Sequence, residues 1–161
     1  MGTSFTELLL VIAVSLILLV AIVLGLQKAR EGSNQSEVIQ GVYMLRTNID
    51  QMYSGSSYNG LNNSIVVQAE LAPKSMIRNN ALRTAYGAVS VEASSETQYS
   101  IELADITKSG CQQIGRLSPD SWASIEINGT DVLDFDSGSV DPSSLITACD
   151  NARNVIKFTT P

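Results

Sequence analysis

The chain has 161 residues, with 10 basic and 16 acidic side chains, a formal net charge of −6 and no histidine. An acidic chain without a Lys/Arg cluster disfavours a nucleic-acid surface, and the lack of histidine removes the commonest general base and transition-metal ligand. We therefore expect no nucleic-acid partner, no catalytic site, no metal site and no cofactor.

The first predicted element is an apolar helix. The 19 residues from Leu8 to Leu26 carry one polar side chain, Ser15. At about 1.5 Å rise per residue they span roughly 28 Å, close to the hydrocarbon core of a bilayer. Glu7 stands at the start of this stretch, where an ionised carboxylate is costly, so we expect it to have a cationic partner.

The helix is expected to continue as an amphipathic segment over residues 33–54. No proline interrupts residues 7–53, and apolar residues recur at steps of 4, 3, 4 and 3, which is typical of a helix with one buried face. Gly25 and Gly32 are its expected weak points and predict local melting in a stretched assembly. The residues of the expected buried stripe are Val38, Val42, Leu45, Ile49 and Met52.

The remainder predicts a small antiparallel sheet with short helices, hence an α+β fold in which the long helix packs on the sheet. We expect a functional division into residues 1–30, the apolar helix, and residues 31–161, the head. The expected elements are a turn cluster over 54–60, a helix over 64–71 capped by Ser64, an irregular surface connection to residue 85, strands over 86–92 and 98–103, a helix capped by Thr107, a strand over 122–127, a hairpin turn at Asn128-Gly129 leading to 132–133, a loop over 134–144, a helical or irregular patch over 145–149 and a closing strand over 155–160.

Two cysteines, Cys111 and Cys149, leave two interpretations open. In an exported domain the pair indicates a disulfide, and in a cytosolic protein it indicates two unrelated thiols. Export is favoured, and a bridge closing a 38-residue loop would contribute about 4 kcal/mol in the chain-entropy model.

The charges around the apolar stretch conflict with export. Residues 1–7 contain no Lys or Arg, whereas Lys28 and Arg30 follow the stretch, and the positive-inside rule would then leave the head in the cytoplasm. The conflict disappears if a basic leader has been removed from the N-terminus.

Two other patterns are better explained as ordinary solvent-exposed surface than as functional sites. The triplets at Asn62 and Asn128 match the glycosylation acceptor pattern, which is common by chance. The aspartates at positions 131, 134, 136 and 141 lack the spacing and the bidentate glutamate of a calcium loop.

The N-terminus resembles that of type IV pilins. Their pattern is a glycine, a cleavage point, a glutamate at the fifth mature position and a long apolar helix. In this sequence the matching run is Gly2-Thr3-Ser4-Phe5-Thr6-Glu7-Leu8-Leu9-Leu10-Val11-Ile12. On that mapping cleavage follows Gly2, Thr3 is the first mature residue and Glu7 is the fifth, while a mature start at Met1 remains the alternative.

Two later stretches are similar to the cysteine-bearing segments of the type IVb branch. They are residues 105–114, around Cys111, and residues 147–160, which contain Cys149 and the last strand. The resemblance extends to conjugative thin-pilus and toxin-coregulated-type major pilins.

The resemblance implies a structural subunit. It would be stored in the inner membrane, processed by a prepilin peptidase, methylated at its new N-terminus and polymerised by the assembly machinery into an extracellular pilus of identical subunits. In that filament Glu7 would neutralise the N-terminal amine of a neighbour. The alternatives are a minor pilin, a secretion-system pseudopilin or an unrelated single-pass anchored binding domain; adhesion, conjugation, motility and uptake all remain open as the purpose of the filament.

Overall fold

The computed structural model describes residues 5–134 and 137–161. The chain divides into two compact units, Met1–Asn34 and Gln35–Pro161. Helix α1, Phe5–Met52, is one unbroken helix that includes Gly25 and Gly32, which confirms the expected continuity. The functional division between residues 1–30 and 31–161, and the melting of the helix at its glycines in a stretched assembly, stay predictions.

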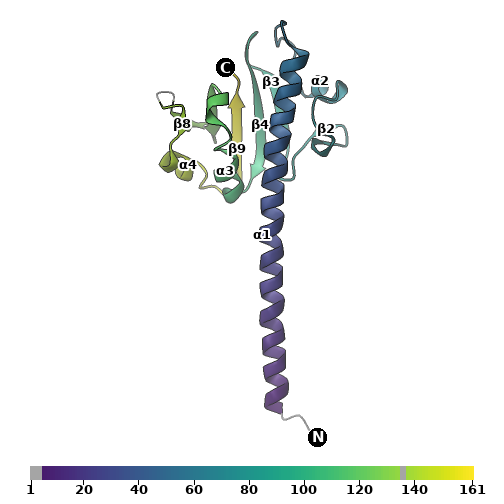
Figure 1. Cartoon of the computed structure of the whole chain (residues 1–161), viewed down its shortest axis with the longest axis vertical. Helices are drawn as coiled ribbons and strands as arrows, with labels where there is room; N and C mark the ends of the chain where they lie inside the picture. The colour runs from purple at the N-terminus through teal and green to yellow at the C-terminus, as the bar shows by residue number, and fades with distance from the viewer. Residues whose placement is uncertain (1–4, 135–136) are drawn as a thin grey trace. The chain divides into compact units, whose positions relative to one another are not determined.

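The second unit is built on a five-stranded antiparallel sheet with the strand order β3-β4-β9-β5-β6. The last strand of the chain, β9, lies in its centre between β4 and β5 (Figure 1). The predicted closing strand is therefore confirmed. The strands are β3 (Val89–Ala93), β4 (Tyr99–Ile106), β5 (Ser124–Ile127), β6 (Thr130–Asp131) and β9 (Asn154–Thr159).

Alternation along these strands gives the sheet one apolar and one polar face. The apolar face carries two rows that run in register across four strands: Val91, Ile101, Phe158 and Ile125, and Val89, Leu103, Ile156 and Ile127. On the opposite face Lys157 stands in register between Glu102 and Glu126. Opposite charges side by side on neighbouring strands favour this register.

Within the second unit, α1 contributes its buried stripe to the same core as the apolar face of the sheet. Val38, Val42, Leu45 and Ile49 are fully or almost fully buried, as the spacing predicts. Met52 was predicted to belong to this stripe, and that prediction is wrong. It is the last residue of the helix, and its side chain is 52% exposed.

Each short α-helix begins directly after a residue whose side chain caps its N-terminus. Helix α2 (Asn63–Gln68) is capped by Asn62, whose Oδ1 accepts from the backbone N–H groups of Ser64 and Ile65, so the predicted cap at Ser64 is wrong by two residues. Thr107 caps α3 (Lys108–Ile114) as predicted. Helix α4 (Pro142–Ala148) begins earlier than predicted because Asp141 caps it and a proline occupies its first turn.

The segment predicted as an irregular surface connection up to residue 85 is ordered and partly buried. It forms the 3-10 turn η1 (Lys74–Met76) and a hairpin of β1 (Ile77–Arg78) and β2 (Ala81–Leu82). Asn79 and Asn80, both at positive φ, make its two-residue turn. Met76 and Leu82 lie in the core.

The predicted loop over 134–144 also contains structure. Strand β7 (Leu133–Asp134) pairs with β8 (Ser139–Val140), and the short turn η2 (Pro119–Ser121) precedes β5. Asp136 lies outside the described residues.

Candidate functional site

The first unit presents an apolar helix surface. Eight large apolar residues whose side chains the structure describes there are between 48 and 69% exposed in the isolated chain: Leu9, Leu10, Ile12, Val14, Leu16, Ile17, Val20 and Leu26. Exposed apolar surface on this scale marks a site of interaction, because leaving it in water is unfavourable. Within the described part of the chain, no helix meets the length and hydropathy that crossing a membrane demands.

The predicted assembly and processing residues belong to this region. Glu7 lies within α1, and its side chain is outside what the structure describes. Gly2, Thr3 and the alternative start Met1 lie outside the described residues. The pairing of Glu7 with an N-terminal amine, and cleavage between Gly2 and Thr3, therefore stay predictions.

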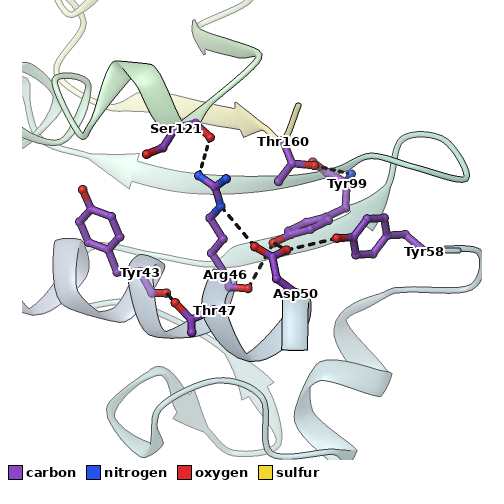
Figure 2. Close-up of polar contacts among 8 residues, drawn as sticks. All are labelled: Tyr43, Arg46, Thr47, Asp50, Tyr58, Tyr99, Ser121 and Thr160. Atoms are coloured by element: carbon purple, nitrogen blue, oxygen red, sulfur yellow. Dashed lines mark hydrogen bonds and ion pairs between the residues drawn. The ribbon is translucent and has the colours of Figure 1, made fainter. Parts of the chain in front are cut away.

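A polar network joins α1 to the sheet in the second unit (Figure 2). Asp50 on α1 accepts hydrogen bonds at Oδ1 from the hydroxyl of Tyr99 on β4, at 2.8 Å, and from the hydroxyl of Tyr58, at 3.2 Å. Its other oxygen lies 3.6 Å from Nε of Arg46, one turn earlier on the helix. Asp50 thus connects three segments of the chain: α1, the loop after it and strand β4.

Arg46 extends the network toward the segment that leads into β5. Its Nη1 donates to the backbone carbonyl of Ser121, and its guanidinium carbon lies 4.5 Å from the centre of the Trp122 ring. Trp122 donates in turn to the carbonyl of Leu117 at 3.1 Å. One turn before Arg46, the hydroxyl of Tyr43 contacts that of Ser118. This face of α1 therefore holds the sheet and residues 117–122 together.

The rings of the two tyrosines that donate to Asp50 pack against each other in a tilted arrangement, with their centres 4.8 Å apart and their planes at 58°. Burial raises the pKa of Tyr99 above its ordinary value, and the hydrogen bond to Asp50 and the charge of Asp50 raise it further. The pKa of Tyr58 is raised by burial first and then by the charge of Asp50. Both phenols are therefore protonated donors at neutral pH, which suits a structural clamp.

Sequence reasoning missed this network. Its one local signal is the spacing of Arg46 and Asp50, four residues apart on one helix face. Nothing local links Asp50 to Tyr99, which lies 49 residues further along the chain.

The predicted disulfide is present. Cys111 on α3 is bonded to Cys149 at the end of α4, across a sequence separation of 38 residues, and both are fully buried. Beside the bridge, Lys108 forms an ion pair with Asp150. The region from residue 111 to residue 149 is thus fastened at its two ends.

Asn128 ties the hairpin turn after β5 to this region. Its Nδ2 donates to the carbonyl of Ala148 at 2.8 Å and to Oδ1 of Asn154 at 2.9 Å, and its Oδ1 accepts from the N–H of Val155 at 3.0 Å. Asn154 is itself fully buried. The hydrogen bonds of the Asn128 amide thus join β5, the end of α4 and β9.

Comparison with known proteins adds three findings. A family model described as PilS N terminal matches residues 32–161. The fold is similar to that of a type IVb pilin from Salmonella typhi, with 17% identity over 74% of this chain and 95% of that one and a TM-score of 0.59. It is also similar to TcpA, a type IV pilin from Vibrio cholerae El Tor biotype, with 12% identity over 80% and 99% of the two chains and a TM-score of 0.55. No characterised protein matches by sequence.

Proposed function

The chain belongs to the PilS family of type IV pilins, and on that premise we propose that it polymerises into an extracellular filament through its N-terminal helix. Family membership makes it a structural pilus subunit, and its fold is that of type IVb pilins. The family and the fold point to a structural protein and not to an enzyme. They also remove the alternative of an unrelated anchored binding domain.

The observation that carries the proposal is the contrast between the two units. The second unit buries most of its large apolar side chains in one core, whereas the first exposes eight of those that the structure describes between Leu9 and Leu26. Such a helix is stable only when lipid or other apolar helices cover it. We propose that the inner membrane covers it before assembly and that identical helices cover it in the filament.

Glu7 is the residue proposed to distinguish these two environments. A carboxylate at the edge of an apolar helix bundle needs a cation, and the N-terminal amine of a neighbouring subunit supplies one. Removing one partner of such a buried pair typically costs about 3–5 kcal/mol. The pairing therefore favours assembly over storage in lipid.

The test is substitution of Glu7 in the native host. Glu7→Gln and Glu7→Ala are expected to leave the subunit in the membrane fraction and to abolish filaments in electron micrographs. Glu37→Gln is the matched control, because Glu37 is an acid on the same helix. Among the described residues its carboxylate forms one ion pair, a solvent-exposed contact of 3.9 Å between its Oε1 and Nη2 of Arg78, which contributes little to stability. Normal filaments from both Glu7 variants would refute the proposed role.

The charge distribution of the head supports contacts between neighbouring heads in the filament. Residues 71–91 carry three basic and no acidic side chains, whereas residues 117–152 carry seven acidic and no basic ones. The two segments lie toward opposite edges of the sheet, the first around β2 and the start of β3 and the second around α4, β8 and β6 (Figure 1). Contact between unlike patches of identical subunits is heterologous, and it generates an open helical polymer when its rotation does not close into a ring.

We propose a major subunit, with a minor pilin or a pseudopilin as the alternatives. In that case purified filaments contain this chain as their bulk component by electrophoresis and electron microscopy. A filament in which it is a trace component would instead support a minor role.

Processing is proposed to follow the type IV pattern, with a prepilin peptidase cutting after Gly2 and N-methylation of Thr3. Mass spectrometry of the N-terminal peptide from native filaments tests this directly. A peptide that begins at Met1 without a methyl group would contradict it.

A further inference from the structure

The chain contains two Asn-Gly dipeptides, Asn59-Gly60 and Asn128-Gly129. This dipeptide is the one most prone to spontaneous deamidation, because a glycine presents its backbone nitrogen to the asparagine side chain without steric hindrance from a Cβ. Both glycines have positive φ, 84° and 82°, and neither has a neighbour within 4 Å of the position of a Cβ. The two sites are therefore alike in sequence and in the freedom of the glycine.

They differ in what holds the asparagine amide. Both N–H bonds of the Asn128 amide are used, by the carbonyl of Ala148 and by Oδ1 of Asn154, and its oxygen accepts from Val155. Turning the Asn128 side chain toward the nitrogen of Gly129 would break all three hydrogen bonds. The fold therefore protects this site.

Asn59 has no such restraint. Asn59 is exposed, and its side chain makes no hydrogen bond or ion pair with any described residue. It stands in the turn that follows α1, which is closed by a backbone hydrogen bond of 2.9 Å from the N–H of Leu61 to the carbonyl of Tyr58. The side chain is thus free to rotate while the turn holds Gly60 next to it.

We propose that Asn59 is a site of spontaneous deamidation on the folded subunit and that Asn128 is its protected counterpart. The backbone nitrogen of Gly60 attacks Cγ of Asn59, a C–N bond forms, and the Cγ–Nδ2 bond breaks. Nδ2 leaves as ammonia with the proton that the backbone nitrogen has lost. Water then opens the resulting five-membered imide at either carbonyl, which gives an aspartate or an isoaspartate at position 59.

The modification would act on the junction that joins α1 to the sheet. Tyr58, the residue before Asn59, donates its hydroxyl to Asp50, and its backbone N–H donates to the carbonyl of Glu96 at 2.9 Å. Deamidation adds a negative charge at the residue next to Tyr58, which makes both of these contacts. An isoaspartate also lengthens the backbone within the turn, so the hydrogen bond from Leu61 to Tyr58 is expected to weaken.

The experiment follows both dipeptides in one sample. The purified full-length subunit in detergent is incubated at mildly alkaline pH, digested and analysed by peptide mass spectrometry for the mass gain of amide-to-acid conversion. In the native protein, Asn59 is expected to convert about tenfold faster than Asn128 or more, a ratio equivalent to about 1.4 kcal/mol, because only Asn128 must release hydrogen bonds. With urea and reductant, the two rates become similar.

Equal rates in the native protein, or faster conversion at Asn128, would overturn the proposal. Asn59→Gln is the control for peptide assignment, since it removes the signal at position 59 and leaves that at Asn128 unchanged. Asn59→Asp supplies the charge without the longer backbone. A lower melting temperature for the aged wild-type protein than for Asn59→Asp would then identify the isoaspartate as the destabilising product, and equal melting temperatures would contradict the expected weakening of the turn.

Discussion

Asp50 shows how single side chains fix the long helix on the sheet. Its carboxylate forms an ion pair with Arg46, one turn earlier on α1, and accepts hydrogen bonds from the hydroxyls of Tyr58 and Tyr99. A carboxylate with three such partners defines both the rotation and the axial position of the helix, because apolar packing alone tolerates small shifts.

The tyrosines predict a loss of stability at alkaline pH. A tyrosine whose pKa is raised by folding stabilises the native state fully below its unfolded pKa of about 10, and this contribution disappears as the pH rises above that value. For Tyr99 burial and Asp50 raise the pKa, so the urea midpoint of the wild type is expected to fall above pH 10. The Tyr99→Phe variant should be less stable at pH 7, by about 1–2 kcal/mol, because Asp50 loses a hydrogen bond.

Above pH 10 Tyr99→Phe should lose less further stability than the wild type. Tyr53→Phe is the matched control. Tyr53 lies in the same aromatic cluster, with its ring centre 5.4 Å from that of Tyr58, and it donates no hydrogen bond to Asp50. The same alkaline loss in wild type and Tyr99→Phe would contradict the assignment.

A side chain at position 41 is expected to disturb the packing of α1 in the core. A Cβ at this position would lie 2.5 Å from Sδ and 3.2 Å from Cγ of Met76, which is almost fully buried. Gly41→Ala should therefore destabilise the head by about 1–3 kcal/mol despite the better helix propensity of alanine. In Gly32→Ala, by contrast, a Cβ has no neighbour within 4 Å. Thermal unfolding of both variants measures the difference, and an unchanged Gly41→Ala would show that Met76 moves aside freely.

At the scale of elements, those with a local signal were predictable and those held by distant contacts were not. Apolar periodicity located α1 and β9, and Asn128-Gly129 located a turn. The β1–β2 hairpin was missed because strands of two residues show no alternation and because Asn79 and Asn80 reach positive φ without a glycine.

The start of β3 was also missed, for a local reason. Tyr86 was predicted to open the strand, but Oγ1 of Thr84 accepts from the backbone N–H groups of Tyr86 and Gly87 and forms a turn there, so the strand begins at Val89. At the outer edge of β3, Asn63 accepts from the N–H of Val91 at 2.7 Å and donates to the carbonyl of Val89 at 2.9 Å, and the backbone N–H of Ala93 donates to the carbonyl of Leu61 at 3.2 Å. A sequence gives no sign that an asparagine of α2 will take the place of a neighbouring strand.

The disulfide is the element whose removal should matter most. The double variant Cys111→Ala/Cys149→Ala is expected to lose about 2–5 kcal/mol of unfolding free energy, because the bridge restrains a 38-residue loop in the unfolded chain. Urea unfolding of the full-length subunit measures this. Lys108→Met, which removes only the exposed ion pair with Asp150, should be close to wild type. A double variant as stable as Lys108→Met would contradict the expectation.

At the scale of the whole molecule, the fold class and four of the five residues of the buried stripe of α1 followed from the sequence, and the cysteine pairing was the favoured one of two interpretations, since each depends on a repeated or paired pattern. The polar network at Asp50 did not, because it joins α1, a loop and β4 through residues 8 and 49 positions away. The proposed assembly site depends on a second copy of the chain. In the isolated subunit its only signs are the exposed apolar surface of the helix and Glu7, an acid that needs a cationic partner.

A cryo-electron microscopy structure of the assembled filament tests polymerisation through the N-terminal helix most directly. The predicted result is a core of packed α1 helices in which the Glu7 carboxylate of one subunit lies within about 4 Å of the N-terminal amine of Thr3 in a neighbour, the range of an ion pair. A filament held together by the heads alone, or one in which Glu7 faces solvent with no amine near it, would contradict it.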